Sequence, residues 1–176
     1  MEKDLKKYIR SIKDFPKKGI MFRDITTLLK DPLAVKSTLE QLYDFSKDLN
    51  ISKVVGIESR GFIFGALLAD KLNAGFVPIR KPGKLPAEKE SASYALEYGT
   101  DSIEIHKDAI KLGEKVILHD DLLATGGTAK AAAGLIEKLG GEVIQISFII
   151  ELTFLNGREK LKGYDVRSLI EYENEE

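Results

Sequence analysis

Short runs of strand-forming residues alternate with helical segments through most of the chain, and this alternation is what most constrains the fold. Strands that alternate with helices favour a mostly parallel sheet, here of about five strands, with helices on both faces. The strands are predicted at 53–57, 75–79, 115–119, 142–152 and 164–172, and two of the helices at 61–73 and 126–139. Ligands in such folds bind at the carboxyl ends of the strands.

The N-terminal part of the chain departs from this alternation. Residues 14–26, DFPKKGIMFRDIT, are predicted to form a loop because Pro16 and Gly19 interrupt them. Asp31 and Pro32 suit the cap and first turn of a helix that runs to about Leu49. Four apolar residues at helical spacing predict a short amphipathic helix at the N-terminus: Leu5, Tyr8, Ile9 and Ile12.

The middle of the chain holds a polar segment followed by a hairpin. Residues 80–91 contain Pro82, Gly83 and Pro86, and they are predicted to form a long mobile loop. SYALEYG and SIEIH then alternate like two strands, with Gly99 at their turn.

Length and composition limit the class of protein. A chain of 176 residues suits one domain with one core. A net charge of −1 argues against a general nucleic-acid binder, and the lack of cysteine excludes disulfides and thiolate chemistry. The N-terminus is too charged for a signal peptide, and no apolar run approaches the roughly 20 residues that span a bilayer. We therefore expect a cytoplasmic protein.

The stretch VILHDDLLATGGTA, residues 116–129, puts two acids and a glycine turn where a strand gives way to a helix. Asp120 and Asp121 are costly to bury together, but carboxylates accept hydrogen bonds well and suit the vicinal hydroxyls of a ribose. Gly126 and Gly127 let a ligand approach the main chain, and a helix N-terminus attracts phosphate. The stretch indicates a ribose 5-phosphate site; the alternative is a capped helix after a tight turn.

This stretch resembles the phosphoribosyl diphosphate (PRPP) signature of type I phosphoribosyltransferases, in the form found in the branch that acts on adenine. The resemblance covers nearly the whole chain, because five other segments match in order: DFPKKGIMFRDIT, GIESRGFIFG, RKPGKLP, SYALEYG and ELTFLNGREKL. It implies an α/β fold of the type I phosphoribosyltransferase kind, with a mostly parallel sheet, helices on both faces, a flexible hairpin loop and a small hood from about residues 1–30.

The resemblance implies roles for the residues that bind PRPP. Asp120 and Asp121 would bind the ribose hydroxyls. Arg60 suits a diphosphate because its guanidinium is a permanent planar cation. The 5′-phosphate would lie against Ala124, Thr125, Gly126, Gly127 and Thr128. The diphosphate would bind Glu58, Ser59, Arg60, Gly61, Lys81 and Lys84.

Further implied roles concern the base. Adenine would bind between Phe22 and Leu122, with the backbone around Met21 and Arg23 reading its edge. Glu97 matches the carboxylate that the family places near the base, and Tyr98 lies beside it. The candidate catalytic residues are therefore Glu97, Tyr98 and Arg60.

These expectations describe a glycosyltransferase of purine salvage that converts adenine and PRPP to AMP and diphosphate. Mg²⁺ is the expected cofactor, held mainly by PRPP and water, because magnesium prefers phosphate oxygens and water to a full protein cage. No metal ligands from the protein are therefore expected. The resemblance also implies a homodimer. Neither nucleic acid nor membrane is an expected partner.

Two alternatives remain open from the sequence. One is a phosphoribosyltransferase for a 6-oxopurine such as xanthine or hypoxanthine, although such a base asks for a donor where Leu122 and Leu123 follow the acids. The other is a regulator that binds PRPP without catalysis. Two residues depart from the family pattern. His119 occupies a position that is usually aliphatic, and we expect it to be a buried structural histidine. Glu58 stands where some relatives carry aspartate, a mild change that leaves its diphosphate role intact.

Overall fold

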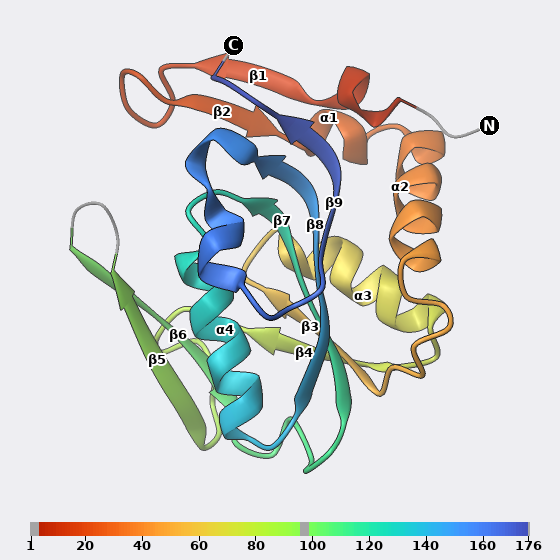
Figure 1. Cartoon of the computed structure of the whole chain (residues 1–176), viewed down its shortest axis with the longest axis vertical. Helices are drawn as coiled ribbons and strands as arrows, with labels where there is room; N and C mark the ends of the chain where they lie inside the picture. The colour runs from red at the N-terminus through yellow and green to blue at the C-terminus, as the bar shows by residue number, and fades with distance from the viewer. Residues whose placement is uncertain (1–3, 96–98, 176) are drawn as a thin grey trace.

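The computed structural model describes residues 4–95 and 99–175, so Glu97 and Tyr98 lie outside the described residues. Figure 1 shows a central twisted sheet with helices on both sides. The elements are η1 (Leu5–Tyr8), β1 (Arg10–Lys13), β2 (Met21–Asp24), α1 (Thr26–Leu29), α2 (Pro32–Asp44), β3 (Lys53–Ile57), α3 (Gly61–Lys71), β4 (Gly75–Ile79), β5 (Lys89–Ala95), β6 (Thr100–His106), β7 (Lys115–Leu123), α4 (Gly127–Lys138), β8 (Glu142–Leu152), η2 (Thr153–Leu155), η3 (Gly157–Leu161) and β9 (Val166–Tyr172).

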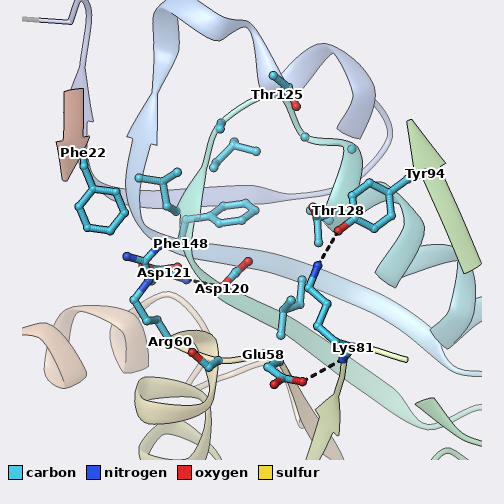
Figure 2. A pocket seen from close by; sticks show the side chains of 18 residues that line it. Phe22, Glu58, Arg60, Lys81, Tyr94, Asp120, Asp121, Thr125, Thr128 and Phe148 are labelled. Carbon is cyan, nitrogen blue, oxygen red and sulfur yellow. Dashed lines mark hydrogen bonds and ion pairs between the residues drawn. The ribbon is translucent and has the colours of Figure 1, made fainter. Parts of the chain in front are cut away.

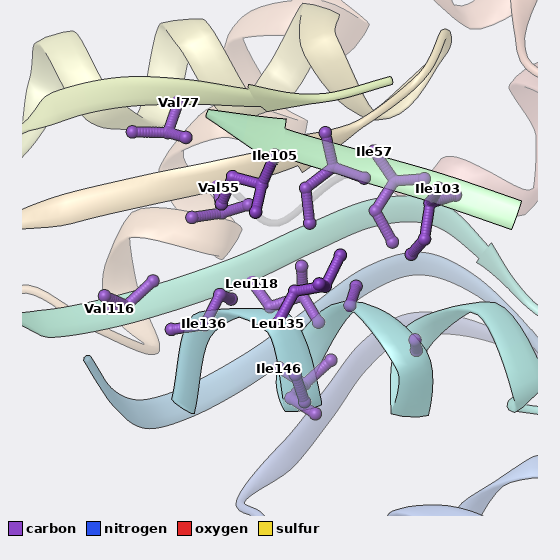
Figure 3. Close-up of a cluster of buried hydrophobic side chains, with 14 of the residues drawn as sticks. Val55, Ile57, Val77, Ile103, Ile105, Val116, Leu118, Leu135, Ile136 and Ile146 are labelled. Carbon is purple, nitrogen blue, oxygen red and sulfur yellow. The ribbon is translucent and has the colours of Figure 1, made fainter. Parts of the chain in front are cut away.

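Five parallel strands form the central sheet in the order β4-β3-β7-β8-β9, which confirms the predicted sheet. Successive side chains of a strand point to opposite faces. In β7, Val116 and Leu118 therefore join the apolar cluster under α4 and the β5–β6 hairpin (Figure 3), whereas Ile117 joins the cluster under α2 and α3. Both faces of the sheet are buried, so its strands read as continuous apolar runs.

The bounds of β3, β4 and β8 agree with the prediction, and α4 is one residue shorter at each end. Strand β7 differs, because it continues beyond His119 to Leu123. Its pairing with β8 extends to the register Leu123↔Glu151, so the backbone of Asp120 and Asp121 belongs to the sheet. The two acids therefore lie within a strand and not after it.

The N-terminal segment corrects two predictions. The expected amphipathic helix is only the single turn η1, and Ile12 lies instead in strand β1. The expected loop contains strand β2, which pairs antiparallel with β1 so that Ile12 faces Phe22 and Arg10 faces Asp24. Leu5 is still buried, as the helical spacing suggested, but pairing between distant residues overrides that spacing from Arg10 onward.

Smaller differences concern where elements begin and end. Helix α2 ends at Asp44 rather than near Leu49, and β5 already begins at Lys89, inside the expected loop. The β5–β6 hairpin forms as predicted on either side of residues 96–98. Within the described part of the chain, no helix is both long and apolar enough to span a membrane.

Candidate active site

A cavity of about 590 Å³ opens at the carboxyl ends of β3, β4 and β7 (Figure 2). Most of the predicted site residues line it: Phe22, residues 58–60, Lys81, residues 120–122 and residues 124–128. Met21, Arg23, Gly61 and Lys84 are predicted site residues that do not line it. The volume falls in the range of small-molecule sites, roughly 300–1,000 Å³.

The acid pair lies at the floor of this cavity. Asp121 is only 4% exposed, and its Oδ2 lies 2.8 Å from Nε of Arg60, as an ion pair whose N–H is not aligned for a hydrogen bond. Oδ1 of Asp120 accepts a hydrogen bond from the backbone N–H of Asp121. Burial and then the charge of Asp121 raise the pKa of Asp120 well above its usual value. Burial also raises the pKa of Asp121, although Arg60 opposes the shift.

Gly61 explains how the β3 loop reaches the acids. A Cβ at Gly61 would lie 2.9 Å from Oδ1 of Asp120 and 2.9 Å from the carbonyl oxygen of His119. Only a glycine lets α3 begin so close to β7. Gly61 therefore supports the site through packing, while the neighbouring Arg60 faces the cavity.

The glycine turn begins helix α4. Gly126 caps the helix in a left-handed conformation, with φ of +80°, which favours glycine. Residues 124–128 line the cavity, and α4 starts at Gly127, so the first N–H groups of the helix have no partners within it. This arrangement attracts an anion.

Glu58 and Lys81 connect the ends of β3 and β4. The carboxylate of Glu58 accepts a hydrogen bond of 2.9 Å from the backbone N–H of Lys81 and pairs with Arg80 at 3.3 Å. The Lys81 hydrogen bond lowers the pKa of Glu58. Glu58 thus holds the start of the 80–88 loop, and the carboxylate itself is already engaged.

The ammonium of Lys81 points toward the hairpin (Figure 2). It lies 3.3 Å from the hydroxyl of Tyr94 and forms an ion pair with Asp101. Burial acts to lower the pKa of Lys81, but the bonds to Asp101 and Tyr94 outweigh it and leave this pKa raised. Lys81 is therefore cationic, and its partners lie on β5 and β6.

The predicted base pocket contains Phe22 and Leu122, and the structure adds Phe148 of β8. Phe22 also lies 5.0 Å from the guanidinium of Arg60. The side chain of Arg23 is buried elsewhere, over the ring of Tyr172 at 3.8 Å, which leaves only its backbone near the site.

Tyr94 and Phe148 line the cavity but were not predicted. Tyr94 is visible in the sequence only as one residue of the SYALEYG strand. Phe148 lies in the middle of an unbroken apolar run, where nothing distinguishes a cavity residue from a core residue. His119 is fully buried, as expected, with Nδ1 2.9 Å from the hydroxyl of Ser147.

Known proteins resemble this chain over nearly its full length. Residues 24–175 match the family described as phosphoribosyl transferase domain. The adenine phosphoribosyltransferase of Christiangramia forsetii is 61% identical over 172 residues, which cover 96% of this chain and 99% of that protein. That of Thermoanaerobacter pseudethanolicus has a crystal structure with a TM-score of 0.95 and 55% identity, covering 98% of this chain and 100% of that chain.

A third similar protein is the adenine phosphoribosyltransferase of Saccharomyces cerevisiae, solved in complex with an imino-altritol bisphosphate and adenine. It is 42% identical, with a TM-score of 0.89 and coverage of 94% of this chain and 96% of that chain. These similarities favour neither a phosphoribosyltransferase for a 6-oxopurine nor a regulator that binds PRPP without catalysis. The chain belongs to the phosphoribosyltransferase family, and within it to the adenine phosphoribosyltransferases, which transfer a phosphoribosyl group to adenine.

Proposed function

We propose that the cavity at the carboxyl edge of the sheet is where this chain converts adenine and PRPP to AMP and diphosphate. The observation that carries the proposal is the convergence of the acid pair, the glycine turn and two cations, Arg60 and Lys81, on one cavity. The acids accept hydrogen bonds from the ribose hydroxyls, and residues 124–128 bind the 5′-phosphate through backbone N–H groups and threonine hydroxyls.

The diphosphate is the leaving group of this reaction. The bond from C1′ to the diphosphate oxygen breaks with its electron pair on oxygen, and a bond forms from C1′ to N9 of adenine. The proton of N9 passes to the departing diphosphate or to water. Negative charge grows on the diphosphate as positive charge grows on the ribose. Arg60, Lys81 and Lys84 stabilise that negative charge, and closure of the 80–88 loop over the site excludes water.

The base lies between Phe22 on one side and Leu122 and Phe148 on the other. Its edge is read by the backbone around Met21 and Arg23, which agrees with an Arg23 side chain that is bound elsewhere. Glu97 and Tyr98 act on the base or on the positive ribose. Adenine is also a ligand of the similar yeast enzyme.

Mg²⁺ fits this site as a companion of the diphosphate. Burial raises the pKa of both acids, and the charge of Asp121 raises that of Asp120 further. A nearby cation opposes these shifts because it favours the charged carboxylates. No group of three or more His, Asp or Glu that could hold a metal occurs within residues 4–95 and 99–175, so phosphate oxygens and water supply most ligands. When bound, the ion neutralises charge on the diphosphate.

The assembly and location follow from the same proposal. The chain acts as one domain, with the β1–β2 hairpin as its hood. It forms a homodimer, for which Ile63 and Leu67 of α3 offer an exposed apolar surface, at 39% and 37% exposure. We place the enzyme in the cytoplasm, because PRPP and AMP are charged and do not cross membranes unaided.

A diphosphate-release assay tests the proposal. It contains the protein, PRPP and Mg²⁺ with adenine, hypoxanthine, guanine, xanthine or orotate in turn. We expect adenine to be preferred by at least about 100-fold in kcat/KM, or about 2.7 kcal/mol of differential transition-state binding. Comparable turnover of hypoxanthine or guanine would contradict the assignment of adenine as the base. If no diphosphate were released with any base, the assignment of catalytic activity would be wrong.

A further inference from the structure

The phosphate turn, residues 124–128, has no positively charged side chain of its own. Behind it lies η3, Gly157–Leu161, which belongs to the ELTFLNGREKL segment. None of the roles proposed above uses this segment. Its contacts with the turn and with the sheet suggest what it does.

The backbone of η3 packs directly against the backbone of the phosphate turn. A Cβ at Gly157 would lie 2.3 Å from the carbonyl oxygen of Ala124, and a Cβ at Gly126 would lie 2.4 Å from the carbonyl oxygen of Gly157. Such distances leave no room for a side chain on either glycine. The position of η3 therefore limits the shape that the turn can adopt.

An ion pair between the half-exposed Arg158 and the buried Glu151 fixes η3 to the sheet. Arg158 donates from Nε and Nη2 to the two carboxylate oxygens of Glu151, at 2.7 and 2.6 Å, and Ser168 donates to the same carboxylate at 2.7 Å. Glu151 is only 3% exposed and lies opposite Leu123, where β7 ends and the turn begins. The bidentate geometry restrains both the direction and the distance of Arg158.

The same segment brings a cation to the turn. Nζ of Lys160 lies 4.0 Å from the point that a Cβ on Gly127 would occupy. The ammonium of Lys160 forms no hydrogen bond or ion pair within residues 4–95 and 99–175. Lysine is unfavourable beside the positive N-terminus of a helix unless an anion lies between them.

We propose that Arg158 is a positioning residue for the 5′-phosphate site: its ion pair with Glu151 holds η3 so that Gly157 shapes the turn and Lys160 faces the phosphate. This inference rests on the proposed assignment of residues 124–128 to the phosphate. Loss of the ion pair lets η3 move away, which loosens the turn and withdraws the cation. The protein then binds ligands with a 5′-phosphate more weakly, whereas its binding of adenine is unchanged.

The test compares Arg158→Leu with Arg158→Lys. The first removes both bonds to Glu151, together with those that Arg158 donates to the Val166 carbonyl and the Ser168 hydroxyl. The second keeps the charge but not the paired geometry. For Arg158→Leu we expect the Kd of AMP and the KM of PRPP to rise by about 10-fold, and for Arg158→Lys by about 3-fold. The KM of adenine should stay within about twofold in both. All assays are run below the unfolding temperature of each variant, measured by circular dichroism.

Two further variants sharpen the result. Arg167→Leu is the matched control, since Arg167 also forms an ion pair, with Asp165, but near the start of β9 and away from the turn; its constants should equal those of the wild type. Lys160→Met leaves the ion pair between Arg158 and Glu151 intact. It should weaken the binding of AMP but not that of adenine.

A phosphate-selective loss in Arg158→Leu, partly restored in Arg158→Lys, supports the inference. Equal weakening of AMP and adenine, or no change in either, overturns it, because the ion pair would then serve only general stability or nothing at the site. A wild-type protein that neither binds AMP nor releases diphosphate would instead contradict the proposed function, so the two failures are distinguishable.

Discussion

His119 is held inside the sheet with Nδ1 bonded to Ser147, while Nε2 has no hydrogen-bond partner in the described part of the chain. Burial lowers the pKa of His119 to about 4, from an ordinary value of 6.5. The ring is therefore neutral at neutral pH. A buried polar atom without a partner is a known source of lost stability, about 1–3 kcal/mol.

This histidine should make the fold sensitive to mild acid. Between pH 6.5 and 4 the unfolded state binds a proton at His119 that the folded state does not, so stability falls as the pH is lowered. From pH 7 to pH 5 the loss at this site should be about 2 kcal/mol, measured by urea unfolding of the wild type against His119→Val. Ordinary titration elsewhere is common to both proteins.

The buried acids titrate in the opposite sense, which makes the comparison necessary. The pKa values of Asp120 and Asp121 are raised on folding, so the folded state binds more protons at these groups than the unfolded state does. Their contribution to the free energy of unfolding therefore falls as the pH rises from acid. They remain in His119→Val and cancel in the difference. An unchanged pH slope in His119→Val would show that the ring is not protonated on unfolding, against the expectation.

Asp120 illustrates a conflict between stability and function. Its raised pKa means that the carboxylate is destabilising at neutral pH, chiefly through burial and the adjacent Asp121. We expect Asp120→Asn to raise the free energy of unfolding while it lowers activity by about 10-fold or more, because ribose hydroxyls lose a charged acceptor. Urea unfolding and diphosphate release measure the two effects. A variant that is less stable but fully active would mark the acids as structural.

At the scale of elements, the contact between η3 and the phosphate turn depends on glycine. Gly157→Ala would bring Cβ to 2.3 Å from the carbonyl oxygen of Ala124 and 2.9 Å from Cδ1 of Leu123, so η3 must shift. Overpacking of this kind typically costs about 1–3 kcal/mol, and we expect a weaker affinity for PRPP in addition.

Gly134 provides the matched control in a neighbouring element. It lies inside α4, and a Cβ there would have no atom within 4 Å. Gly134→Ala should therefore stabilise the protein by about 0.5–1 kcal/mol without changing PRPP affinity. Thermal unfolding of Gly157→Ala and Gly134→Ala measures the change in stability, and PRPP titration measures the change in affinity. Equal behaviour of the two would mean that the turn accommodates a shifted η3.

The elements also show what the sequence could and could not reveal. Strands β3, β4 and β8 were predicted with the correct bounds because a strand buried on both faces is a continuous apolar run. The β1–β2 hairpin was missed because its pairing joins Ile12 to Phe22 across a loop, and neither segment alternates strongly. The end of β7 was placed too early, since two adjacent acids do not indicate a strand whose pairing with β8 continues past them.

The lining of the candidate site was predictable where its residues form one short segment, and its contacts were not predictable where the fold brings distant residues together. Asp120, Asp121 and the glycine turn form one continuous stretch. In contrast, the ion pair between Arg60 and Asp121 joins residues 61 positions apart by number, and Lys81 meets Asp101 only because β4 and the hairpin are neighbours. Spacing along the chain contains no information about such contacts.

At the scale of the whole molecule, helix α3 offers a surface for assembly. Ile63 and Leu67 are four residues apart on α3, so they share one face of that helix, while Phe64 and Leu68 are fully buried against the sheet. This exposed face starts three residues after Arg60, which faces the cavity. A dimer formed there would therefore brace the diphosphate side of the site.

We expect the wild type to sediment as a dimer at micromolar concentration and the double variant Ile63→Glu, Leu67→Glu to sediment as a monomer. Both side chains are partly exposed, so the charges should break the interface without unfolding the chain. Leu112→Glu is the control, because Leu112 is 90% exposed and lies in the loop before β7, at the amino end of that central strand. A monomeric wild type would contradict the homodimer. If Leu112→Glu were a monomer and the double variant a dimer, the interface would lie away from α3. The expected link between assembly and the diphosphate site would then be wrong.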